Sequence, residues 1–214
     1  MSQTFESIPY TDKAFQQAQS PAQVIQILKD GNARFVGNKN LNKDAHAQVK
    51  ATGGGQFPLA AVLGCIDSRV PAEQIFDLGI GDIFNARVAG NFANTDILGS
   101  LEFACKVAGS KAILVLGHTS CGAVKGACDA VKLGNLTSML ENIQPAVDAV
   151  TDITENRNSS NAEFVQKVAD ANVEQTIAFI RNNSEVLKDM EDKGEITIQG
   201  AMYDVASGEV KFFG

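Results

Sequence analysis

Three residues that can bind a transition metal follow two apolar segments of the chain. Cys65 comes directly after the apolar run 59–64. His118 directly follows the run 112–117, and Cys121 lies three residues further on. Such runs are typical of buried strands, and the carboxyl ends of parallel strands meet at the edge where open α/β sheets bind ligands. Two thiolates and one imidazole are the donors of a tetrahedral zinc site with an open fourth position, so we predict one Zn²⁺ per chain.

The remaining cysteines and the second histidine have simpler interpretations. Cys105 and Cys128 are expected to be small buried hydrophobic residues. His46 stands in a polar stretch and is expected at the surface, with at most a minor role in moving protons. The chain lacks a Cys-x-x-Cys motif, which argues against a thiol redox protein.

Asp67 and Arg69 lie two residues apart just beyond Cys65. On a helix they would point apart, but in a loop that enters Pro71 they can meet. Exposed ion pairs are common and stabilise proteins little, so a plain loop contact is one interpretation. Beside zinc, Arg69 would keep Asp67 ionised, and Asp67 could then orient the nucleophile; we assign both as catalytic. The alternative is a closed, non-catalytic zinc site with Asp67 as permanent fourth ligand.

The segments around these residues alternate between strand and helix patterns. Residues 59–64, 82–88 and 112–117 have the pattern of buried strands, and residues 95–107 that of a helix closed by Gly109. Strand–helix–strand alternation predicts a parallel sheet.

The two ends of the chain add helices and a hairpin. Ser20 and Pro21 open a helix with a capping box, and residues 136–192 are helical apart from a surface loop at 158–161. Strand patterns at 196–203 and 209–213 flank a Gly-containing turn. We predict an α/β fold with a mostly parallel central sheet, flanking helices and a C-terminal antiparallel hairpin. Residues 1–214 would form one domain, with a helical arm over about 1–50 and a zinc-binding core over about 56–214.

Composition excludes two classes of partner. The 214 residues carry a net charge of −7 and a pI near 4.8, and no basic stripe stands out, which argues against nucleic acid. No apolar stretch approaches the ~20 residues that span a membrane. The opening residues MSQTFESIPY lack the features of a signal peptide, so we expect a cytoplasmic protein with reduced thiols.

Two motifs together resemble the paired signature of β-class carbonic anhydrases. They are Cys65-Ile66-Asp67-Ser68-Arg69 and His118-Thr119-Ser120-Cys121-Gly122. The resemblance extends from about Gln56 to Gly126. It implies a zinc-dependent lyase that interconverts carbon dioxide and bicarbonate. A related activity on carbon disulfide or carbonyl sulfide is the alternative.

The resemblance also implies a substrate pocket at a subunit interface. Gln56 would donate a hydrogen bond to a substrate oxygen, serving its own zinc or that of a neighbouring subunit in a homodimer or tetramer. Phe84, Ala89, Phe103 and Gly122 would contribute to a small apolar pocket, although both phenylalanines also fit ordinary core positions. Relatives often have Tyr at the position of Phe103, so a hydroxyl is missing here.

One further implication concerns regulation. Some β-class enzymes have a closed state in which the aspartate binds zinc, stabilised by bicarbonate held by Trp, Arg and Tyr. Arg87 and Tyr203 fill two of these positions, but Val62 replaces the Trp. Because valine cannot donate a hydrogen bond, we expect an open site near pH 8 and no cooperative inhibition by bicarbonate.

Overall fold

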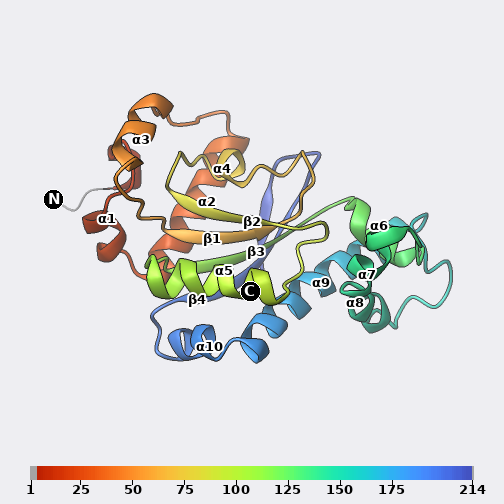
Figure 1. Ribbon diagram of the computed structural model, residues 1–214. Coiled ribbons are helices and arrows are strands. Elements are labelled where there is room, and N and C mark those ends of the chain that lie inside the picture. Colours follow the sequence, from red (N-terminus) through yellow and green to blue (C-terminus); the bar gives the residue numbers. More distant parts are fainter. Residues whose placement is uncertain (1–3, 214) are drawn as a thin grey trace.

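The core of the protein is one sheet with the strand order β2-β1-β3-β4-β5 (Figure 1). In this computed structural model, residues 4–213 are described; residues 1–3 and 214 of the predicted domain lie outside them. Strands β2, β1, β3 and β4 are parallel, and β5 pairs antiparallel with β4, which confirms the predicted fold class. The strands are β1 (Ala60–Gly64), β2 (Ile83–Arg87), β3 (Ala112–His118), β4 (Thr197–Tyr203) and β5 (Val210–Phe212).

Strands β1 and β3 form the buried centre of the sheet, and every residue in both is buried. This explains their uninterrupted apolar sequences, because helices cover both faces of a parallel sheet. Gly64 at the end of β1 pairs with Leu116 of β3. Cys65 directly follows Gly64, and His118 lies two residues after Leu116. Both therefore emerge at the same edge of the sheet.

Helices cover the two faces of the sheet with separate apolar clusters. Alternate residues of β1 point to opposite faces: Val62 joins the cluster containing α2, and Leu63 joins the cluster containing α9. In Figure 1, α6, α7 and α8 gather beside the edge where β1 and β3 end. The helices are α1 (Lys13–Ala18), α2 (Pro21–Val36), α3 (Ala45–Thr52), α4 (Ala72–Ile75), α5 (Thr95–Glu102), α6 (Gly122–Cys128), α7 (Gly134–Glu141), α8 (Gln144–Ala149), α9 (Ala162–Asn183) and α10 (Glu185–Asp192), with a short turn η1 (Phe5–Ser7).

The predicted start of α2 and the predicted surface loop are both confirmed. The Ser20 hydroxyl accepts from the Gln23 N–H, and the Gln23 side chain accepts from the Ser20 N–H, with Pro21 at the first helical position. The loop predicted at 158–161 is present, and Asn161 caps α9, but the helix predicted before it is wrong over 150–157, because the whole connection 150–161 between α8 and α9 is non-helical.

The helix predicted over 95–107 changes type half-way. Residues Thr95–Glu102 are α-helical, whereas Phe103–Val107 form a π-helical turn, η2. The Ala108 N–H bonds to the Phe103 carbonyl, five residues back instead of four. Gly109 then adopts a φ of +85° and ends the element, as predicted. Among the described helices, none is long and apolar enough to cross a membrane.

Candidate metal centre

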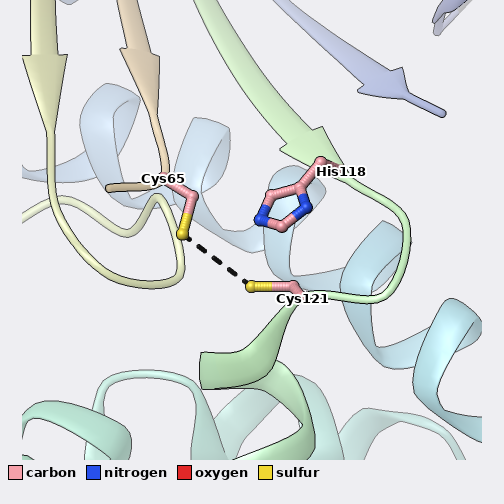
Figure 2. Close-up of side chains that lie close together, drawn as sticks. All are labelled: Cys65, His118 and Cys121. Atoms are coloured by element: carbon pink, nitrogen blue, oxygen red, sulfur yellow. Dashed lines mark hydrogen bonds between the residues drawn. The ribbon is translucent and has the colours of Figure 1, made fainter. Parts of the chain in front are cut away.

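Cys65, His118 and Cys121 meet at the carboxyl edge of the two central strands. Cys65 follows β1, His118 is the last residue of β3, and Cys121 is the N-cap of α6. Ser120 adopts a φ of +56°, which turns the chain between His118 and Cys121. All three side chains are buried, and their ligand atoms lie within 4.8 Å of one another. Figure 2 shows the two sulfur atoms and the imidazole ring converging on one space.

The spacing and bonding of these atoms fit a tetrahedral zinc ion. The two sulfur atoms are 3.9 Å apart, and two Zn–S bonds at a tetrahedral angle would place them about 3.8 Å apart. His118 Nδ1 lies 3.0 Å from the Thr119 carbonyl, which fixes the proton on Nδ1 and leaves the lone pair on Nε2. His118 Nε2 is buried without a hydrogen-bond partner among the described residues. A buried acceptor without a donor is costly, and a cation here would satisfy it.

The two clustered thiols differ from the isolated ones in their acidity. A hydrogen bond from the Cys121 thiol, aided by the Gly90 N–H, lowers the pKa of Cys65. The bond to Cys65 and burial raise the pKa of Cys121, so this pair ionises one thiol readily and the second with difficulty. Burial raises the pKa of Cys105 to about 12 and that of Cys128 to about 11. These two are inert buried thiols, as predicted, and all four cysteines are free.

Asp67 and Arg69 form a two-point ion pair beside the triad. Arg69 Nε donates to Asp67 Oδ1 at 2.9 Å, and a terminal guanidinium nitrogen donates to Oδ2 at 2.7 Å. These bonds hold the pKa of the Asp67 carboxyl well below its usual range. Asp67 Oδ2 also lies 3.9 Å from His118 Nε2. An ionised, oriented carboxylate therefore borders the space that the three ligand atoms enclose.

Arg87 and Gly90 hold the loop that carries Cys65 and Asp67. Arg87 donates to the Cys65 carbonyl at 2.8 Å and to the Asp67 carbonyl at 2.5 Å. The Gly90 N–H donates to Cys65 Sγ at 3.3 Å. The sequence predicted Arg87 only as an anion-binding residue and did not indicate the contact of Gly90 with Cys65. The available signal was the Ala-Gly-Asn turn after β2, which favours a positive φ.

The predicted pocket residues lie in different places. Phe84 of β2 and Phe103 of η2 are in edge-to-face contact, with ring centroids 6.0 Å apart. They line a groove of about 630 Å³ between β2 and α5, and Phe103 is 52% exposed. Ala89 is half-buried in the turn after β2, and Gly122 is the exposed first residue of α6, next to Cys121. Neither Ala89 nor Gly122 lines the Phe84–Phe103 groove.

Gln56 lies at the opposite edge of the sheet from the triad. It is exposed and lines a hollow with Ile80 and Gly81, which precede β2. Strand β1 separates it from Cys65, and five strand residues span about 17 Å. Gln56 therefore does not reach the triad of its own chain. His46 is exposed on α3.

Comparison with known proteins places the chain in a family. A family model described as carbonic anhydrase matches residues 60–210, well over half of the chain. The chain belongs to the β-class carbonic anhydrase family. It is 35% identical over 193 residues to a carbonic anhydrase of Mycolicibacterium smegmatis, covering 90% of this chain and 93% of that one. It is 34% identical over 200 residues to carbonic anhydrase 2 of Mycobacterium tuberculosis, covering 88% and 91%.

Solved β-carbonic anhydrases share the fold. The Aspergillus fumigatus enzyme CafA aligns with a TM-score of 0.68 and 26% identity, over 90% of this chain and 89% of that one. Tetrameric β-carbonic anhydrases of Sordaria macrospora give a TM-score of 0.67 and 26% identity, over 90% and 98%. The family assignment makes this chain a carbonic anhydrase, an enzyme of the lyase class.

Proposed function

We propose that this carbonic anhydrase uses one zinc ion per chain to hydrate carbon dioxide reversibly to bicarbonate and a proton. The observation that carries the proposal is the buried triad of Cys65, His118 and Cys121, bordered by the ionised carboxylate of Asp67. The side chains supply two sulfur donors and one nitrogen donor, which is a zinc-binding set that leaves a fourth position open.

Asp67 and Arg69, beside the triad, have different roles in the reaction. Zinc, when bound, supplies a Lewis acid that makes hydroxide available from water near neutral pH. Asp67 accepts a hydrogen bond from this nucleophile and directs its lone pair toward the carbon of carbon dioxide. Arg69 occupies both Asp67 oxygens, which keeps the carboxylate ionised and holds it in this orientation. The same two bonds disfavour the closed alternative in which Asp67 becomes a permanent metal ligand.

Proton release must rely on solvent or buffer. Each carbon dioxide that is hydrated to bicarbonate releases one proton, which must leave the site. His118 is a proposed metal ligand and is not free to carry protons. His46 is exposed on α3, away from the triad. Cys65 and Cys121 as thiolates would neutralise the charge of a bound zinc ion, which would then acidify water less than a zinc ion held by three neutral imidazoles. We expect the hydration rate to rise on the alkaline side of neutrality.

The substrate side of the site is proposed to need a second copy of the chain. We assign Phe84 and Phe103 to an apolar wall of the substrate site, Ala89 and Gly122 to the part beside the triad, and Gln56 to a hydrogen bond with a substrate oxygen. Because Gln56 lies at the far edge of its own sheet, it would serve the zinc of another subunit in a homodimer or tetramer. Solved β-carbonic anhydrases of Sordaria macrospora are tetrameric, which supports assembly of this chain into an oligomer.

A stopped-flow hydration assay on protein of measured zinc content tests the proposal. We expect turnover of carbon dioxide in proportion to bound zinc. Faster turnover of carbon disulfide or carbonyl sulfide would favour the alternative hydrolase. Full zinc occupancy without any hydration would favour the non-catalytic site.

A further inference from the structure

A tight turn after β2 lies against the metal centre. The Asn91 N–H bonds to the Val88 carbonyl at 3.0 Å, and Gly90 has a φ of +85°, the conformation that a type II turn requires. The Val88 N–H bonds to the Gly64 carbonyl at the end of β1. In Figure 2, the loop that follows β2 runs beside the Cys65 sulfur.

Gly90 is the residue through which this turn reaches the site. Its N–H points at Cys65 Sγ, 3.3 Å away. A Cβ at this position would lie 2.4 Å from Ile143 Cδ1, so a side chain here would force the buried Ile143 side chain to shift and would strain the backbone at this φ. Glycine has the widest choice of backbone conformations, and the direction of its N–H therefore has to be fixed by other contacts.

A contact from Asn172 of α9 fixes the direction of the Gly90 N–H. Its side-chain NH2 donates to the Gly90 carbonyl at 2.8 Å, across 82 residues of sequence. Asn172 is 2% exposed, and its neighbours Val168 and Val173 are fully buried. A polar amide on such an apolar helix face is costly unless it is bonded, and the Gly90 carbonyl is its bonding partner.

We infer that Asn172 is a positioning residue for the Cys65 ligand. It anchors the turn through the Gly90 carbonyl, and the turn presents the Gly90 N–H to the sulfur. This inference rests on the proposed zinc site. A hydrogen bond to a ligating thiolate orients it and lowers the energy of its lone pairs, and such supporting contacts influence metal affinity. Nothing in the sequence pattern connects residue 172 with residue 65.

The test measures metal binding and not turnover. Asn172→Leu keeps the number and branching of the side-chain heavy atoms and removes the donor, whereas Asn172→Ser keeps a shorter donor. We expect Asn172→Leu to weaken zinc binding about tenfold in competition with a chelator. In protein loaded with Co²⁺ in place of zinc, we expect its sulfur-to-metal charge-transfer band to move to lower energy. Asn172→Ser should lie between this variant and the unmodified protein.

Thr176→Val is the matched control, because Thr176 lies one turn further along α9 and is 4% exposed. It should change neither the zinc affinity nor the cobalt spectrum. Unchanged metal affinity and an unchanged spectrum in a folded Asn172→Leu variant would overturn the inference. Failure of both Asn172 variants to fold without metal would also overturn it, because Asn172 would then support the fold and not the ligand. If the unmodified protein binds no zinc, the proposed function fails first; if it binds zinc and hydrates carbon dioxide, only the inference is at stake.

Discussion

The two sides of the proposed active site differ in how completely one chain builds them. On the metal side, Cys65, His118 and Cys121 are all buried; Arg87 and the Gly90 N–H donate to Cys65, and His118 Nδ1 donates to the Thr119 carbonyl. On the substrate side, Gln56 is exposed at the far edge of the sheet, and Phe103 is half exposed beside the unpaired edge of β2. One chain therefore supplies all three proposed metal ligands but only part of the proposed substrate pocket. This contrast predicts that mutations on the two sides will fail in different ways.

The largest effect is expected from loss of a metal ligand. Cys65→Ala, His118→Ala and Cys121→Ala should each reduce zinc from about one ion per chain to near zero, and hydration should disappear with it, because two donors hold the ion poorly. Metal analysis after dialysis checks this. Cys105→Ala, which removes an inert buried thiol, is the control and should keep its zinc. A ligand variant with full zinc occupancy would refute the assignment.

Asp67→Asn should separate metal binding from catalysis. We expect zinc to stay bound and the hydration rate to fall ~10 to 100-fold, because an amide can donate to the nucleophile and misdirect its lone pair. Stopped-flow kinetics at several pH values measure the loss. Asp152→Asn, which removes an exposed carboxylate paired with Lys167, should leave the rate unchanged. Equal turnover of Asp67→Asn and the unmodified protein would exclude Asp67 from the mechanism.

Gln56→Ala should affect the substrate side alone. Zinc content should stay the same, while kcat/KM falls roughly tenfold for one lost hydrogen bond. Gln26→Ala changes another exposed glutamine, on α2, and is the control.

Co-expression sharpens this test. A dimer of one Gln56→Ala chain and one Cys65→Ala chain has one site with intact zinc ligands and, from the partner, an intact Gln56. We expect that site to work at the normal rate. If the activity per bound zinc of the mixed dimers is no higher than that of the Gln56→Ala protein, Gln56 does not act across an interface.

Loss of the ion pair should have a smaller, pH-dependent effect on stability. Arg69 depresses the pKa of Asp67 in the folded state, so the pair contributes stability above the ordinary aspartate pKa of about 3.9 and loses it as pH falls toward the depressed value. Arg69→Gln should therefore slightly lower the denaturant midpoint of zinc-free protein at pH 6, and the difference should shrink below about pH 4. A difference of the same size at both pH values would argue against this linkage.

The smallest expected effect is the response to bicarbonate. Val62 is fully buried in β1, and its side chain cannot donate a hydrogen bond to bicarbonate. The Arg87 guanidinium already donates to two backbone carbonyls. Inhibition by bicarbonate should therefore follow a simple hyperbolic curve near pH 8. A sigmoidal curve, or a structure at that pH with Asp67 on zinc, would show that the closed state is accessible.

The sequence predicted the parts of the molecule that local pattern controls. The apolar runs before Cys65 and His118 placed both ligands at one sheet edge, and the Ser20 capping box located the start of α2 within one residue. It did not predict the π-helical turn at Phe103–Val107, because no local motif marks a five-residue hydrogen bond. It also missed Asn172, since a contact across 82 residues depends on how α9 packs on the sheet.

The position of the ligands at the ends of two central strands also constrains how the protein acquires metal. Cys65 and Cys121 are separated by 56 residues, and between them lie β2, α5 and β3. Bringing these ends together carries a loop-closure entropy that must be overcome before the ligands can meet. His118 and Cys121 offer only two donors within one local loop, so we expect the metal to reach its full donor set only after β1 and β3 have paired. Long-range pairing of this kind is slow, so zinc should slow the unfolding of the chain more than it speeds its folding.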